Sequence, residues 1–233
     1  MANLKRSEAK SISASLSASL LSLSLLSFAL FLLIYLDITL NGPISALDSR
    51  ISLGIAFFRT PFLTAMMESI TYIGNALPMM ILSAILAAVL AVKKIRHDLA
   101  FAVMVLGGAY ILKSLVKYLA VRPRPDGGLI AASESSFPSG HALMTLVFFA
   151  IIIYLFKDRI KEGAKRAIFI ILCIIIPLTV GLSRIYLNVH WASDVISGFF
   201  LGLAWVSIMI FSHKTMIIKN VMSNSEFWLN KKD

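Results

Sequence analysis

Charged residues are scarce in this chain, where they make up 15% of the 233 residues. A soluble domain of this length usually carries about 25%. Hydrophobic residues make up 58%, the mean hydropathy is +0.86, and long apolar runs occupy residues 20–36 and 169–182. So little polar surface excludes an ordinary soluble domain and a disordered chain, and it predicts an integral membrane protein.

Cysteine is almost absent as well, since Cys173 is the one cysteine in the sequence. This count excludes an internal disulfide and the CxxC motifs of metal and redox sites. Acidic residues number 12 against 22 lysines and arginines, which gives a net charge of +10. Such a charge can indicate nucleic-acid binding, but membrane proteins also concentrate lysine and arginine at their cytoplasmic face.

Six segments are apolar enough to cross a bilayer, for which about 20 helical residues are needed. We expect spans at Leu16–Leu36, Ala76–Val92, Leu99–Leu119, His141–Phe156, Ala167–Leu182 and Val195–Phe211. The first is expected to be a retained helix, because its apolar run is too long for a signal peptide and no small-residue cleavage site follows. The predicted fold class is therefore all-α and integral to the membrane, a bundle of six transmembrane helices in a single domain over residues 1–233.

The lysines and arginines are distributed unevenly between the two ends of these spans. Most of them lie before the first span, between the second and third, between the fourth and fifth, and after the sixth. By the positive-inside rule, both termini are expected to be cytoplasmic in a multi-pass protein of the inner (plasma) membrane. Topology thus explains the basic charge, and no nucleic-acid partner is expected.

Residues 43–74, between the first two spans, are neither a clean span nor a polar loop. Hydrophobic side chains recur there every three or four residues, at Leu47, Ile51, Ile55, Phe58 and Phe62. This spacing predicts an amphipathic helix in the outer interface, interrupted at Thr60-Pro61. The sequence leaves two roles open for it, a connector packed on the bundle or a lid that guides lipid.

Three groups of polar residues fall at the outer ends of spans three to six, where charge close to hydrocarbon is costly and usually has a task. The first group contains Lys117 and Arg124, which are two helical turns apart and are followed by a helix-ending proline. Cations of this kind suit a phosphate group, whose oxygens a guanidinium can bind in pairs.

The second group, Ser139, Gly140 and His141, directly precedes the fourth span. We expect Ser139 to cap the helix, so that free backbone N–H groups beside Gly140 bind an anion. His141 would add a proton donor next to that pocket.

The third group contains Arg184, His190 and Asp194. His190 and Asp194 are four residues apart, which makes them neighbours on one helical face. A carboxylate bonded to one imidazole nitrogen leaves the lone pair of the other free to attack. Because successive spans alternate in direction, all three groups share the outer side, and without an acidic metal-ligand cluster they predict metal-free phosphoryl transfer.

With these groups the sequence resembles the phosphatidic acid phosphatase type 2 superfamily, which also includes vanadium haloperoxidases. The signatures of that superfamily are Lys-x6-Arg-Pro, Pro-Ser-Gly-His and Ser-Arg-x5-His-x3-Asp. They occur here in order and without departure within residues 117–194, as Lys117-YLAVRP-Arg124-Pro125, Pro138-Ser139-Gly140-His141 and Ser183-Arg184-IYLNV-His190-WAS-Asp194.

The resemblance implies that His190 is the nucleophile, forming a phosphohistidine, and that Asp194 orients it. His141 would protonate the leaving group and later activate water. The phosphate oxygens would be held by the cations and the start of the fourth span, namely Lys117, Arg124, Arg184, Ser139 and Gly140. We expect no metal, no cofactor and no obligate protein partner.

The membrane-embedded members of this superfamily hydrolyse lipid phosphates and diphosphates, such as phosphatidic acid, phosphatidylglycerophosphate, undecaprenyl diphosphate and lipid A phosphates. A lipid phosphate phosphatase is therefore the expected function, with its active site on the periplasmic or extracellular side. One alternative is a phosphotransferase that uses the same site to deliver phosphate to a second lipid. A more distant alternative is a six-span transporter, which should place its polar groups near the membrane midplane.

Overall fold

The structure, a computed structural model, describes residues 2–229, with side chains over residues 17–216. Within this range the chain is helical and contains no strand. Its helices are α1 (Ala2–Thr39), α2 (Ile44–Ala56), α3 (Pro61–Tyr72), α4 (Ala76–Val92), α5 (Arg96–Ala120), α6 (Gly140–Phe156), the 3-10 helix η1 (Lys157–Arg159), α7 (Gly163–Tyr186) and α8 (Ala192–Leu229). The single domain over residues 1–233 stays a prediction, and residues 1 and 230–233 lie outside the described residues.

Among the described residues, five helical segments are long and apolar enough to cross a membrane. They are Ser17–Thr39 of α1, α5, Gly140–Arg159 (α6 with η1), α7, and Ala192–Met216 of α8. The remaining expected span coincides with α4, which has 17 residues and reaches spanning length only together with α3. The two helices are bent by 42° at the break between them. By length and composition, the described residues thus offer five candidate spans, or six if the bent pair counts as one, and the expected number of six stays a prediction.

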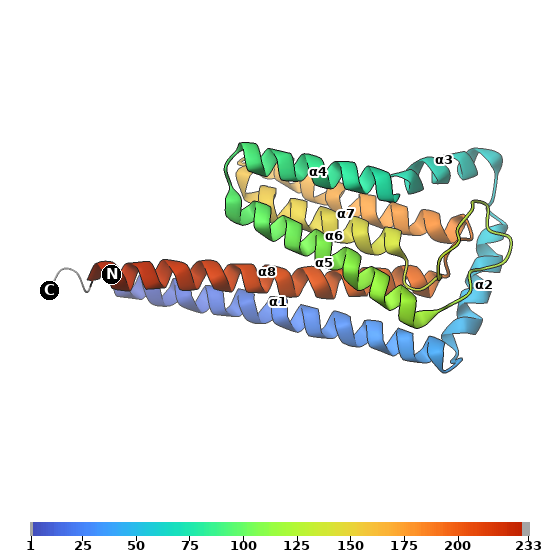
Figure 1. The fold of residues 1–233 in the computed structure, drawn as a ribbon, viewed down its shortest axis with the longest axis horizontal. Helices are drawn as coiled ribbons and strands as arrows, with labels where there is room; N and C mark the ends of the chain where they lie inside the picture. The colour runs from blue at the N-terminus through green and yellow to red at the C-terminus, as the bar shows by residue number, and fades with distance from the viewer. Residues whose placement is uncertain (1, 230–233) are drawn as a thin grey trace.

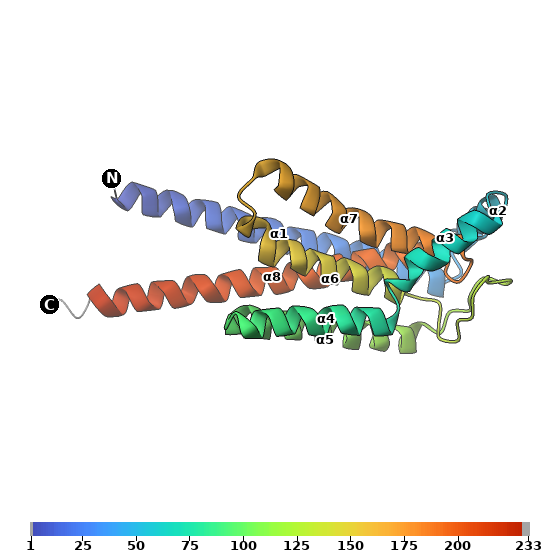
Figure 2. The same ribbon diagram turned by 90° about the horizontal axis from the view of Figure 1, so that it is seen from above.

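The helices form an elongated bundle whose two ends differ (Figure 1, Figure 2). The two longest helices, α1 and α8, pack along each other and extend past the others at the end where both termini lie. α6 packs against both α7 and α8 and is central to the bundle. α2, α3 and the segments that follow α5 and α7 gather at the opposite end.

One row of side chains on α6 forms the centre of the apolar core. Leu143, Val147 and Ile151, spaced four residues apart, are fully buried. They belong to one apolar cluster with Val105 of α5 and Leu201 of α8. Because lipid tails are as apolar as leucine, helices in a membrane associate mainly through close packing of this kind. The outer faces of the bundle expose many further leucines and isoleucines.

Residues 43–74 form two short helices, α2 and α3, with a break where the sequence predicted one. Thr60 caps α3 by accepting a hydrogen bond from the backbone N–H of Leu63, and Pro61 occupies the first helical position. Both residues favour a helix start, so the break follows from local chemistry.

The two sides of this segment face different surroundings. The aromatic side chains around the break, Phe57, Phe58 and Phe62, are exposed on the outside of the bundle. Asp48 of α2 is instead turned inward and is 2% exposed. α2 therefore buries part of its polar side, and its location in the outer membrane interface stays a prediction.

The basic connecting segments lie at the end of the bundle that carries the termini. Both the α4–α5 connection, with Lys93 and Lys94, and the α6–α7 connection are found there (Figure 1). The opposite end carries the motif-bearing segments. This separation agrees with the charge pattern on which the topology was predicted. The assignment of the two ends to membrane sides stays a prediction, and Lys231 and Lys232 lie outside the described residues.

A glycine on α8 tests this packing. A Cβ at Gly198 would lie 2.6 Å from the carbonyl oxygen of Ser139, whereas a Cβ at Gly107 of α5 meets nothing within 4 Å. We expect Gly198→Ala to destabilise the protein by about 1–3 kcal/mol, because the α6 backbone must move. Gly107→Ala, the matched control, should be neutral or slightly stabilising. Thermal unfolding in detergent measures both, and equal melting temperatures would contradict the α6–α8 contact.

Candidate active site

The structure brings the three predicted groups together at the end of the bundle opposite the termini. The segments that carry them are the end of α5 with its following loop, the start of α6, the end of α7 and the start of α8. The charge of Arg124 acts on Lys117, Arg184 and His190. His141 lies within electrostatic range of Arg184 and His190. The residues gathered in this way are Lys117, Arg124, Ser139, Gly140, His141, Arg184, His190 and Asp194.

His190 lies in the turn between α7 and α8 with its two ring nitrogens in different surroundings. Nδ1 is 3.5 Å from the carboxylate of Asp194, and Nε2 is 3.3 Å from the guanidinium of Arg124. Because a guanidinium can only donate hydrogen bonds, Nε2 must accept, and the ring proton belongs on Nδ1. The lone pair of Nε2 therefore points to the cationic side of the site.

Asp194 is held by the start of α8. Its carboxylate accepts the backbone N–H of Trp191 at 2.8 Å, as the third-position acid of a capping box does. It also accepts a hydrogen bond from the hydroxyl of Ser136. His190 thus precedes the helix. The four-residue spacing had predicted that His190 and Asp194 share one helical face, and this prediction is wrong. The capping turn is what brings the two side chains together.

Burial governs the protonation of His190, whose side chain is 2% exposed. Removal from water, the largest effect, lowers its pKa, and so do the guanidiniums of Arg184 and Arg124, whereas the Asp194 carboxylate raises it. Together these effects bring the pKa of His190 from 6.5 to about 4. His190 is therefore neutral near pH 7, which is the state that a nucleophile requires.

His141 lies in the first turn of α6. Ser139 is the N-cap residue, as predicted, and its hydroxyl accepts from the backbone N–H of Ala142 at 3.5 Å. Nε2 of His141 lies 2.8 Å from the amide oxygen of Asn75, which stands at the break between α3 and α4. A proton on Nε2 is thus held toward that oxygen.

Gly140 allows a close contact between α6 and α5. A Cβ at this position would lie 2.9 Å from Cδ of Lys113, whose ammonium group lies 4.5 Å from the ring centre of Tyr110. The glycine therefore lets a lysine side chain cross the start of α6. Hydrogen bonds from Ser139 and Gly140 to a phosphate stay a prediction.

Lys117 and Arg124 both contact the loop that follows α5. Lys117, whose side chain is 10% exposed, donates to the carbonyl of Ser135 at 2.6 Å and lies 3.4 Å from the Glu134 carboxylate. Nε of Arg124 donates to the carbonyl of Glu134 at 2.8 Å, and its Nη1 donates to the carbonyl of Val189. Most of their partners are thus neutral carbonyls, which leaves much of the positive charge uncompensated.

Arg184 has no carboxylate partner among the residues that the structure describes. It is 4% exposed, Nη1 donates to the hydroxyl of Thr71 at 2.9 Å, and its buried Nε makes no hydrogen bond. A buried cation with a free donor is costly unless an anion binds it. Arg184 therefore marks an anion-binding position.

Several residues at the site were missed by the sequence interpretation. Arg122, which occupies an unspecified position of the first signature, lies 2.5 Å from Asp194 and 2.7 Å from Asp48. Thr71 and Asn75 come from a segment with no motif. The sequence carries no local signal for these contacts, because they join residues 74, 113 and 66 positions apart.

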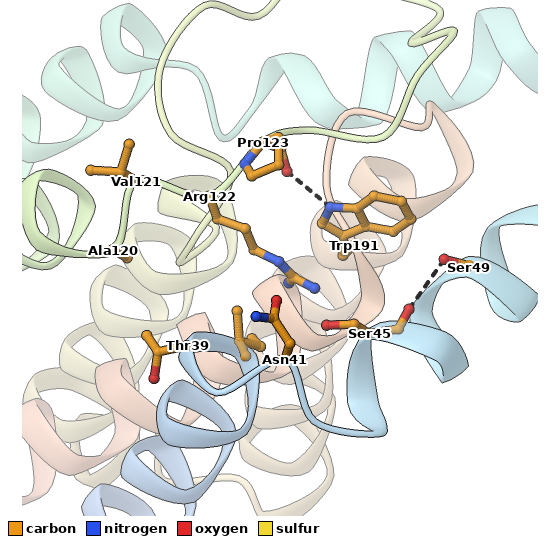
Figure 3. A pocket seen from close by; sticks show the side chains of 10 residues that line it. Thr39, Asn41, Ser45, Ser49, Ala120, Val121, Arg122, Pro123 and Trp191 are labelled. Carbon is orange, nitrogen blue, oxygen red and sulfur yellow. Dashed lines mark hydrogen bonds between the residues drawn. The ribbon is translucent and has the colours of Figure 1, made fainter.

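A pocket of about 440 Å³ lies beside Arg122 (Figure 3). Figure 3 shows the Arg122 side chain extending between Trp191 and Asn41. The indole N–H of Trp191 donates to the carbonyl of Pro123 at 3.0 Å, which fixes the residue after His190 against the loop. The lining residues come from the end of α1, the turn that follows it, α2, the end of α5 with its following loop, and Trp191: Ile38, Thr39, Asn41, Ser45, Ser49, Ala120, Val121, Arg122, Pro123 and Trp191.

The described part of the chain offers no candidate metal site. Within it, no group of three or more histidine, cysteine, aspartate or glutamate side chains is placed to hold a metal ion. The charges that act on His190 are those of Asp194, Arg184 and Arg124. This set favours an anionic ligand, and the absence of a cofactor stays a prediction.

Known proteins resemble this chain in sequence and in structure. A family model described as the PAP2 superfamily matches residues 98–217, a range that includes every predicted site residue. Phosphatidylglycerophosphatase B of Bacillus subtilis is 33% identical over 179 residues, which cover 76% of this chain and 87% of the relative. Undecaprenyl-diphosphatase of Sulfolobus acidocaldarius is 30% identical over 114 residues, 43% of this chain and 48% of the relative.

The fold has a solved counterpart. The crystal structure of a transmembrane PAP2-type phosphatidylglycerolphosphate phosphatase from Bacillus subtilis matches with a TM-score of 0.74 and 29% identity. The match covers 80% of this chain and 93% of that one. Most of the helical bundle described above is therefore shared with this protein.

The protonation of His190 can be measured directly by NMR. In detergent-solubilised protein labelled with ¹⁵N-histidine, we expect the His190 ring to be neutral at pH 6, with its proton on Nδ1. Because burial opposes the charged form, protonation should have its midpoint near pH 4. Comparison with His190→Gln assigns the signal. A midpoint near 6.5, or a proton on Nε2 at pH 6, would contradict the geometry.

Proposed function

The chain belongs to the PAP2 superfamily, and from this premise we propose that it hydrolyses lipid phosphate or diphosphate esters at the outer membrane–water interface. The reaction needs no metal ion and passes through a phosphohistidine on His190. The observation that carries the proposal is the orientation of this ring, with Nδ1 facing Asp194 and the Nε2 lone pair facing Arg124. A nucleophile, its orienting carboxylate and an anion-binding cation thus meet at one side chain.

In the first step, Nε2 of His190 attacks phosphorus and the bond from phosphorus to the lipid oxygen breaks. His141, entering as the imidazolium, donates a proton to the leaving oxygen. The new phosphohistidine carries a positive charge on its ring, and the Asp194 carboxylate beside Nδ1 stabilises it.

In the second step, water replaces His190 on phosphorus. His141 is now neutral and takes a proton from the attacking water, so that the bond from phosphorus to Nε2 breaks and inorganic phosphate leaves. The ring of His190 returns to its neutral form and His141 to its protonated form. The cycle consumes one water molecule and no other reactant.

The surrounding cations stabilise the transferring phosphoryl group, for which positioning and charge are the main catalytic factors. Arg184 supports this role because its buried Nε has no partner among the described residues. For Lys117 and Arg124, phosphate oxygens would replace some of the present contacts with residues 134–135. The exposed carboxylate of Glu134 would then turn to solvent.

A lipid substrate follows from the position of the site at one end of a bundle of membrane-spanning helices. Among the expected substrates, phosphatidylglycerophosphate has the most support, because the relative matched over most of both chains is named for it. Membrane orientation rests on the basic segments gathered at the opposite end, which the positive-inside rule assigns to the cytoplasm. The site then faces the periplasm or the cell exterior.

The two histidines can be separated by the leaving group. We expect His190→Ala to be inactive on both phosphatidylglycerophosphate and p-nitrophenyl phosphate, since both need a nucleophile. His141→Ala should lose about 10²–10⁴-fold on the lipid but much less on p-nitrophenyl phosphate, because nitrophenolate departs without a proton. The initial burst of product is measured, since turnover also needs His141 as a base.

The matched control is His97→Ala, at the first turn of α5 and far from the site, which should keep full activity on both substrates. If folded His141→Ala loses the same factor in burst rate on the lipid and on p-nitrophenyl phosphate, the general-acid role of His141 is refuted. Phosphate release by His190→Ala would refute the assignment of His190 as the nucleophile. All assays include a chelator. If the phosphate of the substrate is transferred to a second lipid instead of being released as free phosphate, the protein is a phosphotransferase.

A further inference from the structure

We propose that Asp48 and Arg122 are positioning residues for the catalytic carboxylate: Asp48 of α2 holds Arg122, and Arg122 holds Asp194 in the orientation that serves His190. This inference rests on the proposed function and deepens it. Arg122 occupies an unspecified position of the first signature, and Asp48 lies in a segment that carries none of the three signatures.

One guanidinium bridges two buried carboxylates. Nη1 of Arg122 lies 2.5 Å from Oδ1 of Asp194, and Nη2 lies 2.7 Å from Oδ2 of Asp48. The side chains of Arg122, Asp48 and Asp194 are 8%, 2% and 0% exposed. Because buried charges are stable only when paired and hydrogen-bonded, these side chains fix one another's positions.

The two oxygens of Asp194 have separate partners. Oδ1 contacts Arg122, whereas Oδ2 faces Nδ1 of His190 and accepts from Ser136 and from the backbone of Trp191. Arg122 therefore sets the rotation of the carboxylate, and with it the oxygen presented to the imidazole. This division of contacts is what a positioning role requires.

Asp48 in turn is anchored to the start of α8. Its Oδ1 accepts the backbone N–H of Ser193 at 2.9 Å, and its Oδ2 accepts the hydroxyl of the same residue. One helical turn further along α2, Ser52 donates to the side chain of Asn188 at 2.6 Å. α2 thus docks on both sides of His190, which connects the positions of α2 and of the nucleophile.

The charges also bear on the chemistry. The two carboxylates and one guanidinium leave one negative charge, beside the ring that becomes cationic in the phosphohistidine. Without the charge of Asp48, the full charge of Arg122 would act on Asp194 and weaken its stabilisation of that cation. Asp48→Asn keeps the size of the side chain, removes this charge, and replaces one of the two acceptor oxygens that face Arg122 and Ser193 with an N–H donor.

The test measures the nitrophenolate burst with p-nitrophenyl phosphate, whose amplitude counts competent sites and whose rate reports phosphorylation at each site. Residues that orient the ligands of a metal ion contribute about 10–100-fold to activity, and we expect an effect of the same size from a residue that orients the carboxylate beside His190. We expect Asp48→Asn to lower the burst rate by this factor while the amplitude per folded protein stays near that of the wild type. Glu68→Gln, the same change at an exposed position of α3, should alter neither.

The double variant tests whether Asp48 acts through Arg122. If it does, Asp48→Asn/Arg122→Gln should be no slower than Arg122→Gln alone, since contacting residues are not additive. The inference would be overturned if the two substitutions multiplied their effects in the double variant, or if Asp48→Asn left the burst rate unchanged. A lower burst amplitude at an unchanged rate in Asp48→Asn would likewise overturn it, because it would show that the pair has only a structural role. A wild-type burst that survives His190→Ala would instead refute the proposed function, and the inference with it.

Discussion

A charge placed close to hydrocarbon is stable only when it has a counter-charge, enough hydrogen bonds or a ligand. At one end of this bundle the constraint has two different outcomes. Asp48, Arg122 and Asp194 satisfy one another within the protein, and this cluster fixes the turn that carries His190. Arg184 is satisfied only in part, which leaves binding capacity for an anion. The paired charges of Asp48, Arg122 and Asp194 thus hold the site in place, and the unpaired charge of Arg184 remains able to bind an anion.

The segment between α1 and α4 contributes side chains to this site, although it carries none of the three signatures. Asp48 contacts Arg122, Thr71 contacts Arg184, and Asn75 contacts His141. Each contact joins a polar side chain of the segment to the motif region. The bend between α3 and α4 brings Thr71 and Asn75 to the site from one continuous stretch of chain. The connector therefore takes part in the architecture of the site while its aromatic side remains exposed.

The spans and the motif residues were largely predictable from sequence, because span length and motif spacing are local properties. Helix α4 has the bounds of the predicted segment Ala76–Val92, although it reaches spanning length only together with α3, and Ser139 caps α6 as expected. The partners of Arg122 were not predictable, because Asp48 pairs with it across 74 positions and such pairing leaves no periodic trace. The relation of His190 to Asp194 was predicted for the wrong reason, since a capping turn, and not a shared helical face, brings them together.

The central claim is that Nε2 of His190 attacks a phosphorus atom whose oxygens are held by Lys117, Arg124 and Arg184. Its most direct test is a crystal structure of the protein with orthovanadate, which adopts the five-coordinate geometry of phosphoryl transfer and binds as a transition-state analogue. We expect vanadium bonded to Nε2 of His190, Nδ1 facing Asp194, and the vanadate oxygens contacting the three cations. Vanadate bound to another side chain, with Nε2 of His190 unligated, would contradict the mechanism.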